Sequence, residues 1–160
     1  MHPSRNDLPQ ATREKVVALL NQNLADCMDL SNMAKQAHWN VKGPSFIALH
    51  ELFDKVAAAA REFADEIAER ATALGGIAEG TTQIVGDRTR LATYPLDISR
   101  GHDHVNALAD RMAAFGKHVR AAIDHCDKLG DKDTADLFTE ISREIDKLLW
   151  FVEAHVQADW

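Results

Sequence analysis

Two pairs of potential metal ligands lie within a single stretch of this chain. His50 precedes Asp54 by four residues, and Asp65 precedes Glu69 by four residues. In an α-helix, at about 100° per residue, these four side chains lie within about 100° of one another around the axis. Neutral imidazole and carboxylate oxygens form a ligand set for iron, manganese or zinc. The spacing therefore predicts a metal-binding stripe on one helix face.

The two pairs are too far apart to bind one ion within a single chain. At about 1.5 Å rise per residue, Asp54 and Asp65 are separated by roughly 16 Å along the helix axis. Di-iron bundles that complete their site within one chain use Glu-x-x-His motifs. No glutamate in this sequence is followed by a histidine three residues later. Each pair is therefore predicted to be half of a site.

A two-fold axis across the middle of this helix would complete both halves. It would run the helix antiparallel to its copy, so that His50 and Asp54 of one chain meet Asp65 and Glu69 of the other. Residues 57–60 between the two pairs are all alanine, and small side chains allow two helix backbones to approach closely. The sequence alone thus predicts a homodimer.

Nearby residues leave other interpretations open. His38 could reach the His50 half-site from its own chain, or it could be an ordinary core or surface histidine. Asp65 and Glu69 could form a solvated helix face, and Arg61 on the same stripe could pair with a carboxylate. Four other histidines have no ligand spacing, and the sequence assigns them no role: His102, His104, His118 and His125.

Four segments carry the hydrophobic periodicity of amphipathic helices. They are predicted over residues 9–41, 46–74, 100–129 and 133–157. Lys42-Gly43-Pro44 ends the first helix, and Ser45 and Asp133 are the expected N-caps of the second and fourth. No alternating pattern typical of a β-strand is present, so the sequence predicts an all-α chain.

The lengths of the connections predict the topology. The first and third are short, which makes the helices they join antiparallel neighbours. Residues 75–99 are long enough to run the full length of the bundle, and one such crossover is typical of the ferritin-like four-helix bundle. A short helix is expected within residues 79–87, and Arg88 and Arg90 are expected to be solvated. Residues 9–158 are predicted to form the domain, after a short tail of residues 1–8.

Composition narrows the class of protein. The 160 residues are 46% hydrophobic and 27% charged with only four prolines, which predicts one folded domain rather than disorder. A formal charge of −7 disfavours binding of nucleic acid through the net field. The two cysteines, Cys27 and Cys126, have no metal-site spacing. No signal peptide or membrane span is evident, so the sequence predicts a cytoplasmic protein.

Several separated motifs, in this order and spacing, resemble the signature of the Dps family of mini-ferritins. The match extends over about residues 9–158. Its most specific parts are HWNVKGP at residues 38–44, LHE at 49–51, AERA at 68–71, LGG at 74–76 and LWF at 149–151.

The resemblance implies a ferroxidase site between two-fold-related subunits. One chain would supply His38, His50 and Asp54, the partner would supply Asp65 and Glu69, and Trp39 would lie beside the metal. It also implies a hollow shell of twelve subunits that oxidises Fe²⁺, preferably with hydrogen peroxide or else with oxygen, and stores ferric mineral. Asp136 matches an acidic residue of the family's three-fold pore, although an acid near a helix N-terminus also has a purely structural explanation.

DNA binding is expected to be weak. Residues 1–15 hold three basic and two acidic residues, a net charge of +1 before histidine and the terminal amine are counted. This offers few phosphate contacts, so any affinity should collapse with salt. The expected function is protection of DNA from oxidative damage by removing iron and peroxide. The alternative is a DNA-binding shell that compacts the nucleoid, with a structural or zinc-filled metal site.

Overall fold

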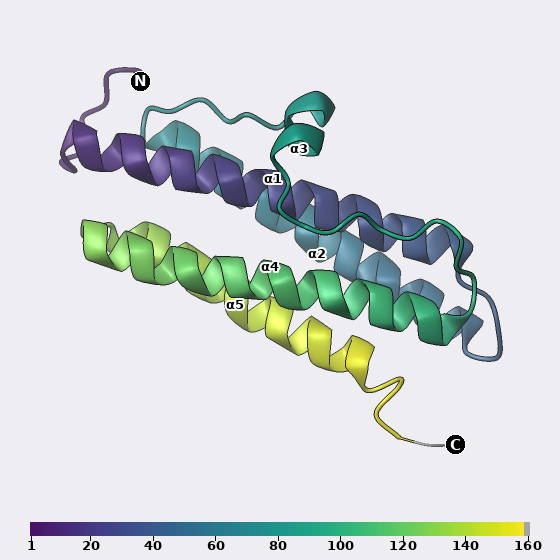
Figure 1. The fold of residues 1–160 in the computed structure, drawn as a ribbon. Coiled ribbons are helices and arrows are strands. Elements are labelled where there is room, and N and C mark those ends of the chain that lie inside the picture. Colours follow the sequence, from purple (N-terminus) through teal and green to yellow (C-terminus); the bar gives the residue numbers. More distant parts are fainter. Residues whose placement is uncertain (159–160) are drawn as a thin grey trace.

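Residues 1–158 are the part of the chain that the computed structural model describes, and their regular secondary structure is entirely helical. The four long helices in this range are α1 (Gln10–Asn40), α2 (Phe46–Ala73), α4 (Gly101–Leu129) and α5 (Lys132–Glu153). The pair α1 and α2 packs antiparallel, as does the pair α4 and α5, and the two pairs form one bundle (Figure 1). The prediction of an all-α four-helix bundle is confirmed.

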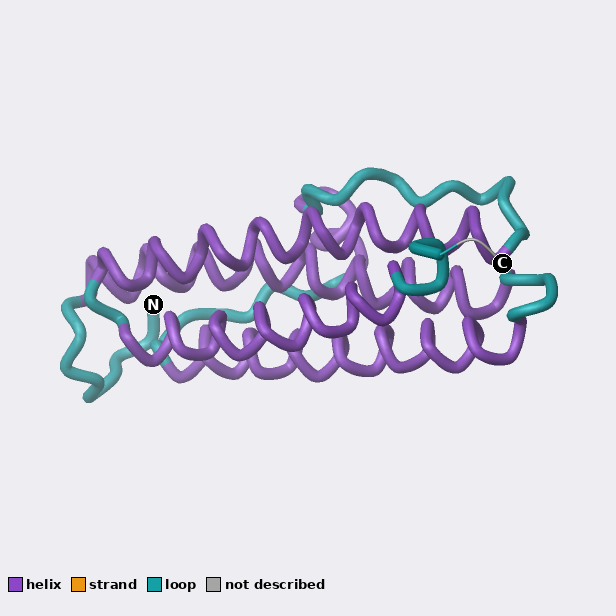
Figure 2. Tube along the Cα trace, turned by 90° about the horizontal axis from the view of Figure 1, so that it is seen from below, coloured by secondary structure: helices purple, strands orange, loops and turns teal. Residues whose placement is uncertain are grey.

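The connection between α2 and α4 crosses the bundle from end to end. It contains the short helix α3 (Thr82–Arg88) and runs along α1 (Figures 1 and 2). Because the connection returns to the end where α2 begins, α4 runs parallel to α2. The single long crossover predicted from loop lengths is therefore present, as is the short helix predicted within it.

The buried face of α2 follows the predicted hydrophobic period. Phe53, Val56 and Ile67 are completely inaccessible to solvent. The other apolar residues at this helical spacing are also buried, namely Leu49, Leu52, Phe63 and Ala71. On a helix with one apolar face, polar residues at intervening positions must turn away from the core. Packing of α2 therefore presents the predicted metal stripe on the outside of the single subunit.

Several helix ends differ from the prediction. Asp131, rather than Asp133, is the N-cap of α5, where its carboxylate accepts a hydrogen bond from the backbone N–H of Thr134 at 3.0 Å. Helix α4 ends at Gly130 in a left-handed conformation (φ 81°), which places Asp131 directly at the start of the next helix. Helix α5 ends at Glu153 instead of near residue 157. Ser45 occupies the predicted N-cap of α2, but its hydroxyl makes no capping hydrogen bond.

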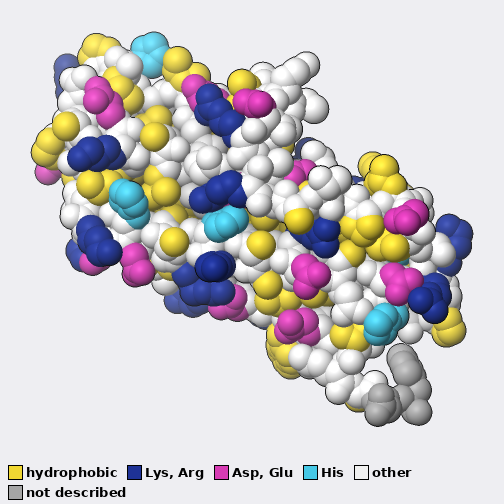
Figure 3. Space-filling model, viewed as in Figure 1, with side chains coloured by type: hydrophobic (Ala, Val, Ile, Leu, Met, Phe, Trp, Pro, Cys, Tyr) yellow, Lys and Arg dark blue, Asp and Glu magenta, His cyan; other side chains and the backbone are white. Residues whose placement is uncertain are grey.

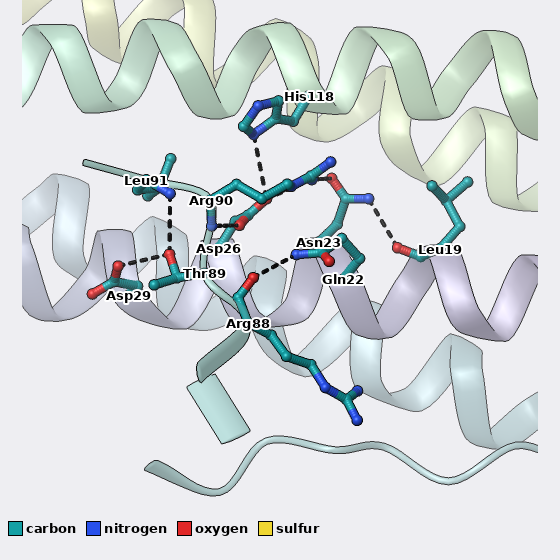
Figure 4. A network of polar contacts seen from close by, with 10 residues as sticks. All are labelled: Leu19, Gln22, Asn23, Asp26, Asp29, Arg88, Thr89, Arg90, Leu91 and His118. Carbon is teal, nitrogen blue, oxygen red and sulfur yellow. Dashed lines mark hydrogen bonds and ion pairs between the residues drawn. The ribbon is translucent and has the colours of Figure 1, made fainter. Parts of the chain in front are cut away.

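A buried carboxylate fixes the crossover to the bundle (Figure 4). Asp26 of α1 is fully buried and accepts hydrogen bonds from the backbone N–H of Arg90 at 2.8 Å and from its Nε at 2.9 Å. His118 of α4 places Nδ1 3.3 Å from the same carboxylate. Arg88 forms an ion pair with Glu79. The prediction that Arg90 is simply solvated was wrong, because sequence periodicity does not reveal a buried partner on a distant helix, whereas Arg88 and Glu79 are both half-exposed.

Removing Arg90 should destabilise the fold far more than removing Arg88. Arg90→Ala leaves the fully buried Asp26 carboxylate without its main cation, and leaving a buried polar group without its partner costs about 1–3 kcal/mol or more. Arg88→Ala removes a half-exposed pair and should cost less than about 1 kcal/mol. Urea denaturation of both variants at one fixed protein concentration measures the difference. Equal free energies of unfolding would contradict the assigned role of Arg90.

Candidate metal centre

Two histidines meet where α1 ends and α2 begins. The rings of His38 and His50 are stacked, with centroids 3.7 Å apart and planes inclined by 20°. Nδ1 of His38 lies 2.7 Å from the backbone oxygen of His50, and Nδ1 of His50 lies 2.8 Å from the backbone oxygen of His38. The sequence-predicted proximity of these residues is thus realised within one subunit.

These reciprocal contacts determine which nitrogen of each ring carries the proton. A carbonyl oxygen can only accept a hydrogen bond, so Nδ1 of both His38 and His50 must be the donor. In a neutral imidazole the remaining nitrogen, Nε2, then carries a free lone pair. Fixing a ring through a backbone carbonyl while the second nitrogen faces a metal is the usual arrangement of histidine ligands. Both rings therefore fit the requirements of metal ligands.

Asp54 lies one turn beyond His50 and is paired with a residue that the sequence analysis missed. Lys35 of α1 places Nζ 2.6 Å from Oδ1 of Asp54. This hydrogen bond is the main reason why the pKa of Asp54 lies below its usual value, and the charge of Lys35 acts in the same direction. The only signal for Lys35 in the sequence was its position one turn before Trp39.

An open groove begins beside this cluster and continues along the faces of α1 and α2. Its first part, of about 550 Å³, is lined by Lys35, Trp39 and Asp54. Its second part, of about 810 Å³, extends to Asp65. The two parts share four lining residues, Ser31, Asn32, Ala58 and Arg61. Trp39 is 65% exposed in the single subunit, so it contributes an uncovered indole to the groove.

The remaining predicted ligands lie apart from the histidine pair. Asp65 and Glu69 are exposed on α2, about three and four turns beyond Asp54, and Asp136 is exposed in the first turns of α5. Within residues 1–158 of one chain, no three metal-binding side chains come together. One subunit therefore brings His38 and His50 together, but Asp54 does not join them in a cluster of three ligands. Asp65 and Glu69 lie farther along α2, away from this pair.

Comparison with known proteins identifies the relatives of this chain. A family model described as a ferritin-like domain matches residues 17–159. The "DNA protection during starvation protein" of Agrobacterium fabrum is 49% identical over 156 residues, which cover 98% of this chain and 96% of that protein. The chain belongs to the Dps family. Its bundle is therefore ferritin-like, as its single crossover predicted.

Solved structures of Dps proteins agree with this assignment. The tetragonal form of Mycobacterium smegmatis Dps has a TM-score of 0.93 and 30% sequence identity, covering 98% of this chain and 95% of that chain. Dps from Microbacterium arborescens in the high iron form has a TM-score of 0.87 and 33% identity, covering 97% of this chain and 99% of that chain. Both matches extend over nearly the full length of each chain.

The tautomers of the two histidines can be tested directly. In protein labelled with ¹⁵N-histidine, the neutral rings of His38 and His50 should carry their proton on Nδ1, because each Nδ1 donates to a carbonyl. Solid-state NMR would assign each signal by its loss in His38→Gln or His50→Gln. Exposed His102 is the control, because neither of its ring nitrogens is hydrogen-bonded to a backbone carbonyl among the described residues. Protons on Nε2 of the paired rings would contradict the proposed ligand geometry.

Proposed function

We propose that this Dps protein is a ferroxidase whose iron sites form between two copies of the chain. Each site takes His38, His50 and Asp54 from one subunit and Asp65 and Glu69 from its two-fold partner, with Trp39 alongside. The observation that carries this proposal is the pair of carbonyl-anchored imidazoles, whose Nε2 atoms are free while Asp54 lies one turn away.

The groove supports assembly around a two-fold axis. It runs along α1 and α2 from Trp39 and Asp54 towards Asp65, in the direction that the two half-sites require. Its floor contains small side chains that allow another helix to approach closely: Ala57, Ala58, Ala64 and Ala68. A partner that runs α2 antiparallel in this groove would bring its own Asp65 to the histidine pair. A C₂ contact of this kind completes two sites at once.

The chemistry follows from placing two ferrous ions close together. Two Fe²⁺ ions supply the two electrons that reduce hydrogen peroxide, with two protons, to two waters. A lone Fe²⁺ supplies only one and releases a hydroxyl radical. Hard carboxylate oxygens such as those of Asp54, Asp65 and Glu69 favour Fe³⁺ over Fe²⁺ and so promote oxidation. Hydrogen peroxide is the proposed oxidant, with oxygen as the alternative.

The ferric product would be stored inside a shell of twelve subunits. Asp136 and the acidic residues around it would line the entrance for Fe²⁺ at the three-fold axis. The protein would work in the cytoplasm, where removal of both iron and peroxide protects DNA from oxidative damage. This agrees with the name of the Agrobacterium relative, which states DNA protection.

Direct compaction of DNA is the less favoured function. The backbone N–H of His2 donates to Gly75 at 2.7 Å, so the N-terminal segment lies against the end of α2. Arg13, one of its few cations, is buried and donates to the Leu74 carbonyl at 2.9 Å. On the face shown in Figure 3, lysine and arginine side chains are interspersed with acidic ones. None of these features offers DNA a continuous basic surface.

Complementation between two defective chains tests the intersubunit site. One chain carries His50→Ala with Asp54→Ala, and the other carries Asp65→Ala with Glu69→Ala. Each homo-oligomer should be inactive, whereas a mixed dimer places both lesions at one site and leaves the second intact. Random mixing should restore about a quarter of the wild-type sites. Iron oxidation followed by absorbance measures the recovery, and no recovery after proven subunit mixing would refute the arrangement.

Lys35 should weaken metal binding at Asp54. In the Lys35→Met variant the carboxylate no longer has a competing ammonium, so Co²⁺ titrated into the assembled protein should bind about two- to fivefold more tightly, as expected for loss of an exposed ion pair. Lys55→Met is the matched control, because Lys55 is exposed next to Asp54 but forms no ion pair among the described residues. Calorimetry that finds unchanged or weaker binding only in Lys35→Met would contradict this competition.

DNA retention should be weak at neutral pH and about 0.15 M salt. The expected cause is the −7 charge together with the anchored N-terminal segment, and any binding seen at low salt should disappear steeply as salt is added. Fluorescence anisotropy of a labelled duplex measures this dependence. Tight binding that resists salt would favour the DNA-compacting shell instead.

A further inference from the structure

A second chemically unusual pair lies in the core behind the metal stripe. Tyr94, in the crossover, is the only tyrosine of the chain and is 6% exposed. Its hydroxyl lies 2.8 Å from Nδ1 of His104 on α4, which is 1% exposed. The two rings are stacked, with centroids 6.0 Å apart. A buried phenol therefore has an imidazole, rather than a backbone carbonyl, as its hydrogen-bond partner.

This imidazole is in the right state to accept a proton. Burial lowers the pKa of His104, while the Ile98 carbonyl and Asp103 oppose that shift. In the tautomer with the proton on Nε2, the neutral ring accepts the phenolic hydrogen bond at Nδ1. Nε2 itself is buried and has no hydrogen-bond partner among the described residues. A backbone carbonyl would satisfy the Tyr94 hydroxyl equally well but could not take its proton.

The pair contacts the helix that carries the proposed ferroxidase ligands. The ring of His104 lies 6.5 Å from that of Phe53, measured between centroids. Phe53 is buried on α2, immediately before Asp54 and three residues after His50. His104 therefore lies between Tyr94 and the inner face of the helix that carries the metal stripe.

We propose that Tyr94 is a redox-active residue that holds one oxidising equivalent for the metal site, with His104 as its proton acceptor. This role rests on the proposed ferroxidase function. It operates when a site contains a single Fe²⁺, the state in which the paired reaction is impossible.

The electrons and protons balance in two steps. One Fe²⁺ reduces peroxide to hydroxide and a hydroxyl radical. Tyr94 gives one electron to that radical, which becomes a second hydroxide, while the O–H bond of Tyr94 breaks and its proton bonds to Nδ1 of His104. A second Fe²⁺ later returns an electron to the tyrosyl radical, and the proton moves back. Two Fe²⁺ ions are then oxidised per peroxide, as in the paired reaction, without release of a radical.

Two nearby cations favour loss of an electron and a proton together from Tyr94. The alternatives are a tyrosine radical cation that keeps its proton and oxidation of Trp39. The Arg111 guanidinium lies 5.7 Å from the centre of the Tyr94 ring, so a tyrosine radical cation that keeps its proton is disfavoured. The electron and the proton must therefore leave together, which gives His104 its role. Trp39 is the competing donor near the site, but the Lys35 ammonium lies 5.7 Å from its ring and opposes oxidation.

The first test uses the assembled wild-type protein with one Fe²⁺ per site under anaerobic conditions. After hydrogen peroxide is added, freeze-quenched samples should show a tyrosyl radical by electron paramagnetic resonance. Growth with ring-deuterated tyrosine should narrow that signal, which assigns it to Tyr94 because the chain has no other tyrosine. Tyr94→Phe keeps the packed ring but should lose the signal and release more hydroxyl radical to a spin trap.

The second test separates proton acceptance from hydrogen bonding. In His104→Gln the amide oxygen can accept the phenolic hydrogen bond but cannot take up the proton, so the radical yield should fall. Circular dichroism and the size of the assembly verify that both variants fold. In an iron-free arm, azide radicals from pulse radiolysis oxidise exposed tryptophans. The tryptophanyl absorption should decay into tyrosyl absorption in the wild type, but persist in Tyr94→Phe and His104→Gln.

The outcomes separate this role from the ferroxidase proposal. Wild-type protein that oxidises two Fe²⁺ per peroxide without a Tyr94 signal, or a signal that survives in Tyr94→Phe, overturns the redox role while the ferroxidase function stands. An undiminished radical yield in His104→Gln overturns the role of His104 as acceptor. Wild-type protein that oxidises no iron refutes the ferroxidase function, and transfer to Tyr94 in the iron-free arm then decides whether the pair is redox-active.

Discussion

The packing of α1 against α2 is the contact on which the rest of the structure depends. It buries one face of α2 in the core, so the opposite face, with its imidazole and carboxylates, must point outward. The same packing brings the last turn of α1 beside the first turn of α2, where His38 and His50 exchange hydrogen bonds through each other's backbone oxygens. Hydrophobic burial thus sets the orientation of the metal ligands, and the short turn between the helices sets their proximity.

The crossover makes the second set of decisive contacts. Arg90 ties it to a buried carboxylate on α1, and Tyr94 ties it to a buried histidine on α4. A segment of this length has a large conformational entropy when it is free, and contacts of ionised or polar groups in the core hold it in one path. This path also places the Tyr94 phenol against His104, whose ring faces Phe53 on the inner side of α2.

The single subunit is chemically incomplete in a specific way. Two imidazoles are fixed with their free nitrogens available, but their carboxylate neighbour Asp54 is paired with Lys35. The other acidic residues of the stripe lie further along the same helix. In the proposed assembly a self-complementary contact would use this separation, because one symmetry axis would join each half-site to its missing half. In this proposal, iron oxidation therefore requires oligomerisation, because each site needs ligands from two subunits.

Much of the fold was predictable because it depends on periodicity and loop length. The inward residues of α2 repeat at helical intervals, and Lys42-Gly43-Pro44 separates α1 from α2. The crossover is long enough for α4 to run parallel to α2. The end of α5 and its N-cap were predicted less well. Asp131 and Asp133 are equally good caps by residue type, and the left-handed turn at Gly130 decides between them.

By itself, the sequence determined that His50, Asp54, Asp65 and Glu69 share one helix face and that one helix cannot bring all four to the same ion. That result needs only the rise and turn of an α-helix. Tertiary structure alone decided the partners of individual polar groups: Lys35 with Asp54, Arg90 with Asp26, and Tyr94 with His104. These residues are far apart along the chain or on different helices. Helical periodicity fixes which way a side chain points, whereas the relative position of packed helices fixes what it meets.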